Sequence, residues 1–401
     1  AKEMDVVSWD NYPRYDTPWS YTAMCHDLMR GLKDAPFMLM EQTPSQQNWQ
    51  QYNSLKKPGQ MRAQSYQTIA HGADTIQFFQ LRRSAGACEK FHGAVIEHAG
   101  TDNTRVFREV RQLGLELERL SAVTPGSVNE AETGIIFDWD NYWALEYTSG
   151  PSVDLTYVKH IHQYYTYFYE RNIPVNLIPF DADFSRYKVV VAPVLYMIKE
   201  GMKEALTSFV EKGGVLILTY MCGIADQSDN VFPGGYPGPL RELAGVWVEE
   251  VDALSPEQSN EVVFKDGTKV SCGLMHTEGA EILAEYGSDF YAGCPAVTKN
   301  HFGEGFVYYI GTNVEEEGLS RVMDMAVADA AVQPVISGAG GLEITCRETD
   351  VCSFYFVLNF KDQELPVPEE LTGYMDMITG EKVPEGEMLS KYDVKIIRVE
   401  K

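Results

Sequence analysis

The chain has 401 residues, of which 44% are hydrophobic and 23% charged, as is ordinary for a globular protein with room for two or three domains. Its 58 acidic residues outnumber 33 basic ones, and the formal net charge of −25 should repel phosphate backbones and anionic lipids. We therefore expect neither nucleic acid nor a membrane as a partner, and no apolar run approaches the roughly 20 residues that span a bilayer.

Strand-like and helix-like patterns alternate over the first 81 residues. In the order strand, helix, strand, helix, strand, the predicted elements are Met4–Trp9, Ser20–Leu32, Pro36–Glu41, Gly59–Gly72 and Thr75–Leu81. A charged amphipathic helix over Thr104–Leu120 completes a third strand–helix unit. This alternation is typical of a parallel sheet built from βαβ units.

The second of these strands is an apolar run that ends in Glu41 and is followed by a polar loop with a proline. The run predicts a strand buried on both faces, with Glu41 projecting at its carboxyl end. In a parallel β/α barrel the chemistry lies where strands end and loops begin, so Glu41 is the first catalytic candidate. A solvated loop glutamate is the alternative interpretation of the same pattern.

The number of units is too small for a whole barrel. An eight-fold barrel needs roughly 200 residues or more, whereas the third unit ends at Leu120. We therefore expect residues 1–122 to be the C-terminal portion of a (β/α)8 TIM barrel. The chain begins with Ala1 instead of methionine, which agrees with a fragment or a processed chain.

A second strand–helix rhythm follows the linker-like segment Ser121–Thr133. It predicts a flavodoxin-like, doubly wound α/β domain over residues 133–334, with a helix over Val153–Arg171. Short β-rich segments separated by turns predict a small antiparallel β domain over residues 335–401. The clearest predicted strands of the middle domain are Val175–Ile178, Val189–Ala192 and Val215–Leu218.

Four further residues are candidates for one pocket with Glu41. Trp49 and Phe79 supply aromatic faces, and Glu89 and His92 are three residues apart, so they share a face if their loop is helical. A sugar site requires such aromatic platforms beside carboxylates, because a pyranose presents an apolar C–H face and a rim of hydroxyls. Core packing is an equal alternative for Phe79. Glu89 and His92 offer only two of the three or four ligands of a zinc site, so we predict no metal there.

Three other patterns have structural interpretations. Cys222 follows a strand, as does the nucleophile of amidotransferase-like sheets, but no histidine lies nearby in sequence, so a packed thiol is favoured. Gly303 and Gly305 predict a hairpin turn. The segment Asp138–Trp143 places two tryptophans among acidic residues, which indicates an inter-domain seam or a subunit contact.

Cysteine usage indicates a reducing compartment, and we expect a cytoplasmic protein. The cysteines form no C-x-x-C pair, and no N-x-S/T sequon occurs. The seven cysteines are Cys25, Cys88, Cys222, Cys272, Cys294, Cys346 and Cys352.

Over its whole length the chain resembles the glycoside hydrolase family 42 β-galactosidases without their N-terminal portion. Several independent motifs in the same order carry the resemblance. They are Asp5–Pro13, Pro36–Gln42 with Asn48–Trp49, Glu89-x-x-His92, Asp138–Ala144, Pro233–Leu240, Leu358–Asn359 and Ile378–Glu381.

The resemblance implies a retaining hydrolase that removes terminal, non-reducing β-D-galactosyl residues from a galactoside substrate. Glu41 would be the nucleophile at the end of the seventh barrel strand. Trp49, Glu89 and His92 would bind the galactose hydroxyls, with Phe79 as a pocket wall. The middle domain would be a trimerisation domain of a homotrimer. No cofactor is implied, and the cysteine cluster that binds zinc in some family members has no counterpart here.

The main departure from the family is the acid/base glutamate, which has no counterpart in this chain. General acid catalysis typically contributes about 10²–10⁴-fold, so we expect this chain alone to be inactive or nearly so. The alternative is a non-catalytic oligomerisation module, or a barrel remnant complemented by another chain.

Overall fold

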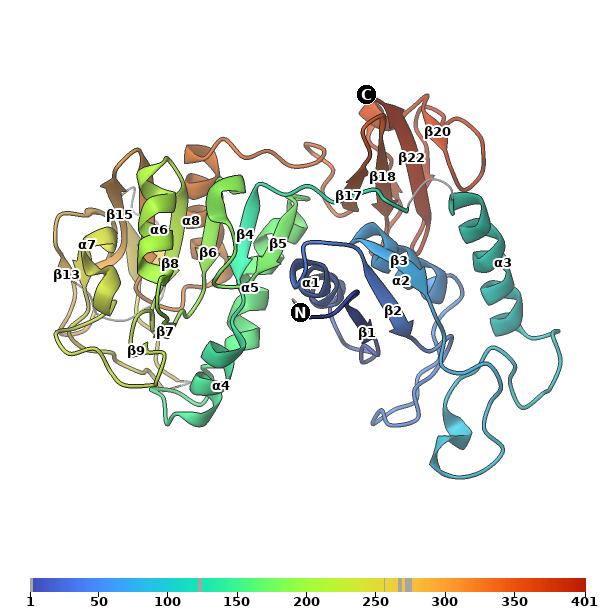
Figure 1. Ribbon diagram of the computed structural model, residues 1–401, viewed down its shortest axis with the longest axis horizontal. Coiled ribbons are helices and arrows are strands. Elements are labelled where there is room, and N and C mark those ends of the chain that lie inside the picture. Colours follow the sequence, from blue (N-terminus) through green and yellow to red (C-terminus); the bar gives the residue numbers. More distant parts are fainter. Residues whose placement is uncertain (1–2, 122–124, 256, 266–268, 271–275) are drawn as a thin grey trace. The chain divides into compact units, whose positions relative to one another are not determined.

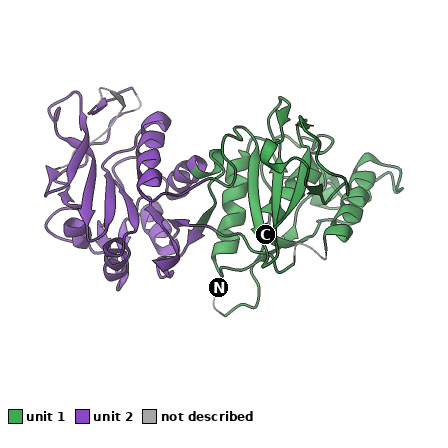
Figure 2. Cartoon of the chain, turned by 90° about the horizontal axis from the view of Figure 1, so that it is seen from above, with its two compact units in different colours: residues 1–130, 168–176, 334–401 green, residues 131–167, 177–333 purple. Residues whose placement is uncertain are grey.

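The computed structural model describes the chain except residues 1–2, 122–124, 256, 266–268 and 271–275, and the chain divides into two compact units (Figures 1 and 2). Unit 1 comprises residues 1–130, 168–176 and 334–401, and unit 2 comprises residues 131–167 and 177–333. The segments 1–122 and 335–401, predicted as separate domains, thus lie in the same compact unit.

Unit 1 begins with a parallel sheet in which strands and helices alternate along the chain, as predicted. Its described strands, in the order β1-β2-β3, are β1 (Ser8–Asp10), β2 (Phe37–Glu41) and β3 (Ala73–Ile76). The accompanying helices are α1 (Trp19–Gly31), α2 (Gln60–Ala70) and α3 (Arg105–Leu120). Thr104 caps α3, because its Oγ1 accepts a hydrogen bond of 3.2 Å from the N–H of Phe107.

The prediction that β2 is buried on both faces is wrong. Phe37 and Leu39 are fully buried, whereas Met40 is 40% exposed. Successive side chains of a strand point to opposite faces, so only the face that carries Phe37 and Leu39 is covered. Phe37 packs there in a small cluster to which α1 contributes Met29.

The first and third strands are shorter than predicted. The first begins at Ser8 instead of Met4, and the third ends at Ile76 instead of Leu81. Beyond Ile76 the backbone follows the loop after β2, and the N–H of Phe79 donates to the carbonyl of Gln42 at 3.0 Å. Phe79 therefore lies past the carboxyl end of β3, on the same side of the sheet as the carboxyl end of β2, where Glu41 lies.

The C-terminal segment of unit 1 forms an antiparallel sheet that shares a core with α2 and α3. Apolar side chains of the two helices, among them Tyr66 and Leu113, cluster with Phe354, Phe356 and Ile396 of the sheet. In the order of the sheet, the described strands are β17 (Glu343–Glu348), β18 (Cys352–Leu358), β22 (Val394–Glu400) and β20 (Met375–Asp376). A separate pair is β19 (Leu365–Pro366) with β21 (Met388–Leu389).

Unit 2 is built on a mixed sheet with the described order β12-β11-β14-β15-β16-β8-β6-β4-β5. The β4/β6, β6/β8 and β8/β16 pairs are parallel, in agreement with the flavodoxin-like expectation. The parallel strands are β4 (Thr133–Ile136), β6 (Val189–Ala192), β8 (Val215–Thr219) and β16 (Gly305–Ile310), and β5 (Val175–Ile178) lies beside β4.

The sheet continues on its other side with antiparallel strands, of which the sequence patterns indicated only the hairpin at Gly303 and Gly305. They are β15 (Pro295–Phe302), β14 (Glu281–Tyr286), β11 (Val262–Phe264) and β12 (Lys269–Val270). Phe302 pairs with Gly305, so Gly303 and Glu304 form the connecting turn. The predicted hairpin at this glycine pair is confirmed, and the positive φ of 60° at Gly303 explains why glycine suits the position.

The helices of unit 2 include one that was not predicted. Asp138–Trp143 lies in and just before helix α4, whose first N–H groups are capped by Asp138. The predicted helix Val153–Arg171 begins four residues later, at Tyr157. The described helices are α4 (Trp139–Tyr147), α5 (Tyr157–Glu170), α6 (Met202–Glu211), α7 (Arg241–Ala244) and α8 (Glu316–Asp329).

The remaining described elements are short. The two-residue strands β7 (Met197–Ile198) and β10 (Val246–Trp247) pair with β9 (Ala225–Asp226) and β13 (His276–Thr277). The 3₁₀ turns are η1 (Cys88–Phe91), η2 (Phe184–Arg186), η3 (Gly238–Leu240) and η4 (Glu369–Leu371). Within the described part of the chain, none of the helices combines the length and apolar character needed to cross a bilayer.

Candidate active site

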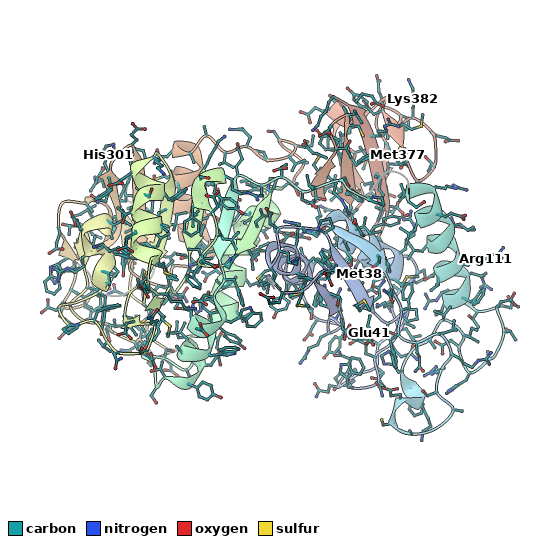
Figure 3. The ribbon with its side chains drawn as sticks, in the orientation of Figure 1. Met38, Glu41, Arg111, His301, Met377 and Lys382 are labelled. Atoms are coloured by element: carbon teal, nitrogen blue, oxygen red, sulfur yellow. The ribbon has the colours of Figure 1, made fainter. Side chains whose placement is uncertain are left out.

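Glu41 lies at the carboxyl end of β2, beyond Met38 on the same strand (Figure 3). Its Oε2 accepts a hydrogen bond of 2.8 Å from the phenol of Tyr12, and its carbonyl accepts one of 2.8 Å from the N–H of Asn11. Both partners follow β1, which runs parallel to β2, so the ends of two neighbouring strands bring the phenol to the carboxylate. The pair therefore lies at the carboxyl ends of the strands, where β/α-barrel proteins bind their ligands.

Three further rings pack beside this pair. Trp49 stacks on His92 with ring centroids 5.1 Å apart, and Phe79 meets the same imidazole edge-on at 5.3 Å. The ring of Tyr12 is edge-on to Trp49 at 4.9 Å and to His92 at 5.9 Å. Trp49 remains 53% exposed, so a large part of its indole is open to a ligand. His92 is fully buried and forms the centre of the cluster.

An oxygen atom lies beside each ring nitrogen of His92. Nδ1 lies 3.2 Å from Oδ1 of Asn48, and Nε2 lies 3.3 Å from the carbonyl oxygen of Phe79. Burial lowers the pKa of His92, and the bond to Phe79 and the nearby charges of Glu89 and Glu41 act in the opposite direction without outweighing it. Burial thus favours the neutral imidazole, which carries one N–H and donates to only one of the two oxygens. The ring serves as a polar support for the indole of Trp49.

The charge around the site is negative. Glu89 lies in the turn η1, and its backbone carbonyl accepts a hydrogen bond of 3.0 Å from the N–H of His92. The negative charge of Glu89 contributes to the raised pKa of Tyr12. Burial and the charge of Glu41 raise the pKa of Asp10, which is paired with Glu41 in the β1/β2 register. Burial, followed by the hydrogen bond to Glu41, raises the pKa of Tyr12 far above neutrality. The phenol therefore keeps its proton and acts as a hydrogen-bond donor to the carboxylate.

The loop after β2 is fixed by buried polar contacts. The hydroxyl of Thr43 donates to the carbonyl of Gln46 at 3.1 Å, and the N–H of Gly93 donates to the same carbonyl at 2.9 Å. A Cβ at Gly93 would lie 3.0 Å from the backbone nitrogen of Gln46, so the close approach of the two loops requires glycine. Lys56 is buried and donates to the carbonyl of Thr43, and burial lowers its pKa to about 7. These contacts fix the first part of the loop that continues to Trp49.

The structure thus places all five residues singled out from the sequence, Glu41, Trp49, Phe79, Glu89 and His92, around the carboxyl ends of β1 to β3. Sequence reasoning missed Tyr12, although it lies in the Asp5–Pro13 motif. Its position in the sequence was the available signal. Tyr12 follows the end of the first predicted strand, and the carboxyl ends of neighbouring parallel strands lie on the same side of a sheet, so Tyr12 could have been expected near Glu41. Across the described residues, no group of three or more His, Cys, Asp or Glu side chains is arranged to hold a metal ion.

The thiol that invited comparison with amidotransferases is not accessible. Cys222 is fully buried in the core of unit 2, among side chains that include Leu218, Leu240 and Tyr309. Burial raises the pKa of this thiol, which disfavours the thiolate that a nucleophile requires. The interpretation as a packed thiol is confirmed.

A carboxylate and an exposed indole at the carboxyl ends of parallel β/α strands suit a glycoside hydrolase, because these enzymes act on a sugar with carboxyl groups and an aromatic ring packs on its C–H face. Family models agree with this class: the β-galactosidase model matches residues 1–120, the β-galactosidase trimerisation domain matches residues 131–333, and the β-galactosidase C-terminal domain matches residues 341–399. The chain belongs to the glycoside hydrolase family 42 β-galactosidases.

Individual relatives match almost all of the chain. It is 51% identical to the β-galactosidase BgaA of a Planococcus species and 48% identical to the β-galactosidase LacZ of Lactobacillus acidophilus, each over 99% of the chain and 60% of the relative. Among solved structures, the β-galactosidase of Bacillus circulans superimposes with a TM-score of 0.96 at 46% identity, and the cold-adapted β-galactosidase of a Rahnella species with 0.92 at 38%. Both matches cover 99% of the chain and 60% of the solved chain. The chain thus spans about 60% of the length of these relatives.

Proposed function

We propose that this chain is part of a retaining β-galactosidase and that Glu41 is its nucleophile. The observation that carries the proposal is the hydrogen bond of 2.8 Å from Tyr12 to Oε2 of Glu41. A phenol that donates to one carboxylate oxygen orients the carboxylate and leaves the other oxygen for attack on an anomeric carbon. The relatives named β-galactosidase supply the substrate class, a terminal β-D-galactosyl residue.

The residues around Glu41 suit a galactose. Trp49 is half-exposed and offers its indole to the C–H face of a pyranose, and Phe79 forms a further apolar wall. Glu89 offers a carboxylate that accepts hydrogen bonds from sugar hydroxyls. His92 supports the indole and contacts Phe79. In this proposal no cofactor is needed, because a double displacement requires only carboxyl groups.

The exposed side of β2 supports a larger barrel. Met40 is 40% exposed on a parallel strand whose other face packs on α1. In a closed (β/α)8 barrel one face of each strand packs on the outer helices and the other fills the interior. We propose that residues 1–122 supply the last strands of such a barrel and that the open face of β2 belongs to its interior.

The reaction needs a second carboxyl group about 5–5.5 Å from the first, to protonate the leaving oxygen. We assign this acid/base role to a glutamate contributed by a segment outside these 401 residues. General acid catalysis typically contributes about 10²–10⁴-fold, so the chain by itself should be inactive or nearly so. A non-catalytic assembly module is the alternative, and it predicts that Glu41 has no influence on activity in any assembly.

We further propose that the protein assembles as a homotrimer in the cytoplasm. The matched trimerisation domain supports the assembly. Helix α4 supplies a candidate contact, because Trp139, Trp143 and Tyr147 are 41%, 53% and 91% exposed at intervals of four residues along one helix face. We propose a cytoplasmic location because the six cysteines that the structure describes are free thiols, as is usual in a reducing compartment.

The test is to join the chain to the N-terminal part of a family relative and to follow hydrolysis of a chromogenic β-galactoside. Glu41→Gln should reduce kcat by several orders of magnitude, and a 2-fluoro-galactosyl inhibitor should label Glu41 in the parent protein. Glu118→Gln is the matched control, because Glu118 is exposed on α3. Activity that survives in Glu41→Gln, or a label on another side chain, would overturn the proposed role.

A further inference from the structure

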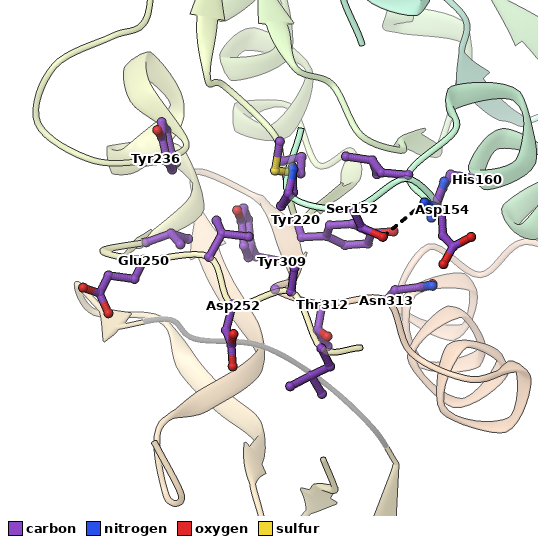
Figure 4. Close-up of a pocket in the computed structure, with 18 of the residues that line it drawn as sticks. Ser152, Asp154, His160, Tyr220, Tyr236, Glu250, Asp252, Tyr309, Thr312 and Asn313 are labelled. Carbon is purple, nitrogen blue, oxygen red and sulfur yellow. Dashed lines mark hydrogen bonds between the residues drawn. The ribbon is translucent and has the colours of Figure 1, made fainter. Parts of the chain in front are cut away.

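Unit 2 contains a cavity of about 280 Å³ beyond the carboxyl ends of β8 and β16 (Figure 4). The residues that line it come from the segment before α5, from α5 itself, from the end of β16 and from the residues that follow β8 and β16. The rest of the lining is Tyr236, Val248, residues 250–254 and Gln258. In open α/β sheets, ligands bind in the crevice outside the carboxyl ends of the parallel strands. The position of the cavity in the fold is therefore that of a binding site, although the candidate active site lies in unit 1.

Two buried polar side chains meet at this cavity. The hydroxyl of Tyr220 is buried and has no hydrogen-bond partner among the described residues. His160 is 3% exposed, and its Nδ1 lies 2.8 Å from the carbonyl of Thr156. A carbonyl only accepts, so Nδ1 carries the proton and Nε2 has a lone pair that can accept a hydrogen bond. The two rings meet edge-on with their centroids 5.7 Å apart, so the two side chains are neighbours.

The protonation of these two side chains suits a ligand hydroxyl. Burial lowers the pKa of His160, and the charge of Lys159 acts in the same direction, so the imidazole is neutral and its Nε2 only accepts. An anion needs donors, which Nε2 does not supply. The acidic side chains Asp154, Glu250 and Asp252 in Figure 4 also line the cavity and disfavour an anion, and Lys159 offsets part of their charge. A ligand hydroxyl fits both groups, because it donates to Nε2 and accepts from Tyr220.

We propose that this cavity binds a neutral, polyhydroxylated molecule of about the size of a monosaccharide. Drug-sized ligands occupy roughly 300–1,000 Å³, so a cavity just below that range suits a single sugar ring. Tyr220 and Tyr309 supply aromatic rings for its C–H face, and Thr312 and Asn313 add polar side chains after β16. The site lies entirely within unit 2 and does not depend on the function proposed for Glu41.

The test is ligand-observed NMR and calorimetry on the 401-residue chain with D-galactose, D-glucose, choline and inorganic phosphate as probes. The background variant is Trp49→Ala, which weakens any sugar binding at the candidate active site. In that background the sugars should still bind, and Tyr220→Phe should weaken the affinity about threefold to tenfold, the effect of one hydrogen bond. Thr312→Val is a second variant of similar shape that removes a hydroxyl at the other side of the cavity.

The control for folding is thermal unfolding without ligand. Tyr220→Phe removes a buried hydroxyl that has no partner among the described residues, so the Tm should stay constant or rise. The proposal is overturned if neither sugar binds in the Trp49→Ala background, or if sugar binding there is insensitive to both cavity variants. Binding of choline or phosphate that is lost in Tyr220→Phe would overturn the neutral character assigned to the ligand.

Discussion

The phenol of Tyr12 donates a hydrogen bond of 2.8 Å to Oε2 of Glu41, and the two residues follow the ends of neighbouring parallel strands. Tyr12→Phe should lower kcat/KM of the joined enzyme roughly 10- to 100-fold, because a hydrogen bond to a charged group contributes about 1.5–3 kcal/mol. The measurement is steady-state hydrolysis of a chromogenic galactoside. Tyr15→Phe is the control, since Tyr15 is half-exposed nearby and should leave the rate unchanged. Equal rates for Tyr12→Phe and the parent would contradict an orienting role for the phenol.

Trp49 should contribute to sugar affinity more than to stability. Its indole is 53% exposed and stacks on His92, so Trp49→Ala should raise KM about tenfold, by the loss of one stacking platform, and change the Tm little. The matched control is Tyr52→Ala, an aromatic on the same loop that is 64% exposed. If both variants raise KM equally, the effect belongs to the loop as a whole and the stacking platform assigned to Trp49 is wrong.

The aromatic face of α4 should be part of the subunit contact. Trp143→Asp places a charge between Trp139 and Tyr147, and burying that charge in an interface is unfavourable. We expect the proposed trimer to dissociate at micromolar concentration, as measured by light scattering after size exclusion. Val351→Asp, at a position 65% exposed in unit 1, should leave the assembly intact. An unchanged trimer in Trp143→Asp would exclude this face from the contact.

A buried histidine should make the stability of unit 1 depend on pH. The Nδ1 of His71 lies 2.8 Å from Asp27, and its Nε2 lies 3.2 Å from Glu343. Burial lowers the pKa of His71, but the two carboxylates outweigh burial and raise it to about 9. Because this folded-state pKa exceeds the unfolded value of about 6.5, the stabilisation is complete below pH 6.5 and is lost as pH rises through about 9.

The corresponding measurement is the free energy of urea unfolding of the chain between pH 6 and 10. The part contributed by His71, taken as the difference between the parent and His71→Gln, should fall over that range by an amount on the order of 3 kcal/mol, which is the free-energy equivalent of the pKa difference. Lys56, whose pKa is lowered to about 7, acts with the opposite sign, but it is present in both proteins and cancels in the difference. His98→Gln, at an exposed position, should follow the parent. A difference between the parent and His71→Gln that does not change with pH would contradict the role of His71.

Arg347 should be essential for the packing of β17 on α2 and β3. It is fully buried, donates to the carbonyls of Ile69 at 3.0 Å and Ala73 at 2.9 Å, and pairs with Asp74 at 2.7 Å. Arg347→Leu leaves these acceptors without their donor, so we expect a loss of about 3–5 kcal/mol in the free energy of unfolding. Arg108→Leu, at an exposed position, should change it by less than about 0.5 kcal/mol. A small effect at Arg347 would mean that the C-terminal sheet is energetically independent of residues 1–120.

The sequence pattern predicted an element correctly where the residues of that element by themselves favour one structure. Val175–Ile178 and Val189–Ala192 are strands with the predicted bounds, because short runs rich in valine and isoleucine that end at a proline favour buried strands. The hairpin at Gly303 followed from a glycine that adopts a positive φ. The pattern failed at β2, where an unbroken apolar run proved to be buried on one face only. It failed again at α4, where aromatic residues gave no clear helical periodicity.

The sequence by itself determined the alternation of strands and helices and the family to which the chain belongs, because both depend on short stretches of neighbouring residues. It also determined the site candidates, which are Glu41, Trp49, Phe79, Glu89 and His92. Only the tertiary structure decided which side chains meet. Tyr12 reaches Glu41, His71 joins Asp27 to Glu343, and His160 lies beside Tyr220. These partners are between 29 and 272 residues apart in the chain. Hydrogen bonds and pKa shifts depend on distances of a few ångströms, and only the packing of strands and helices sets those distances.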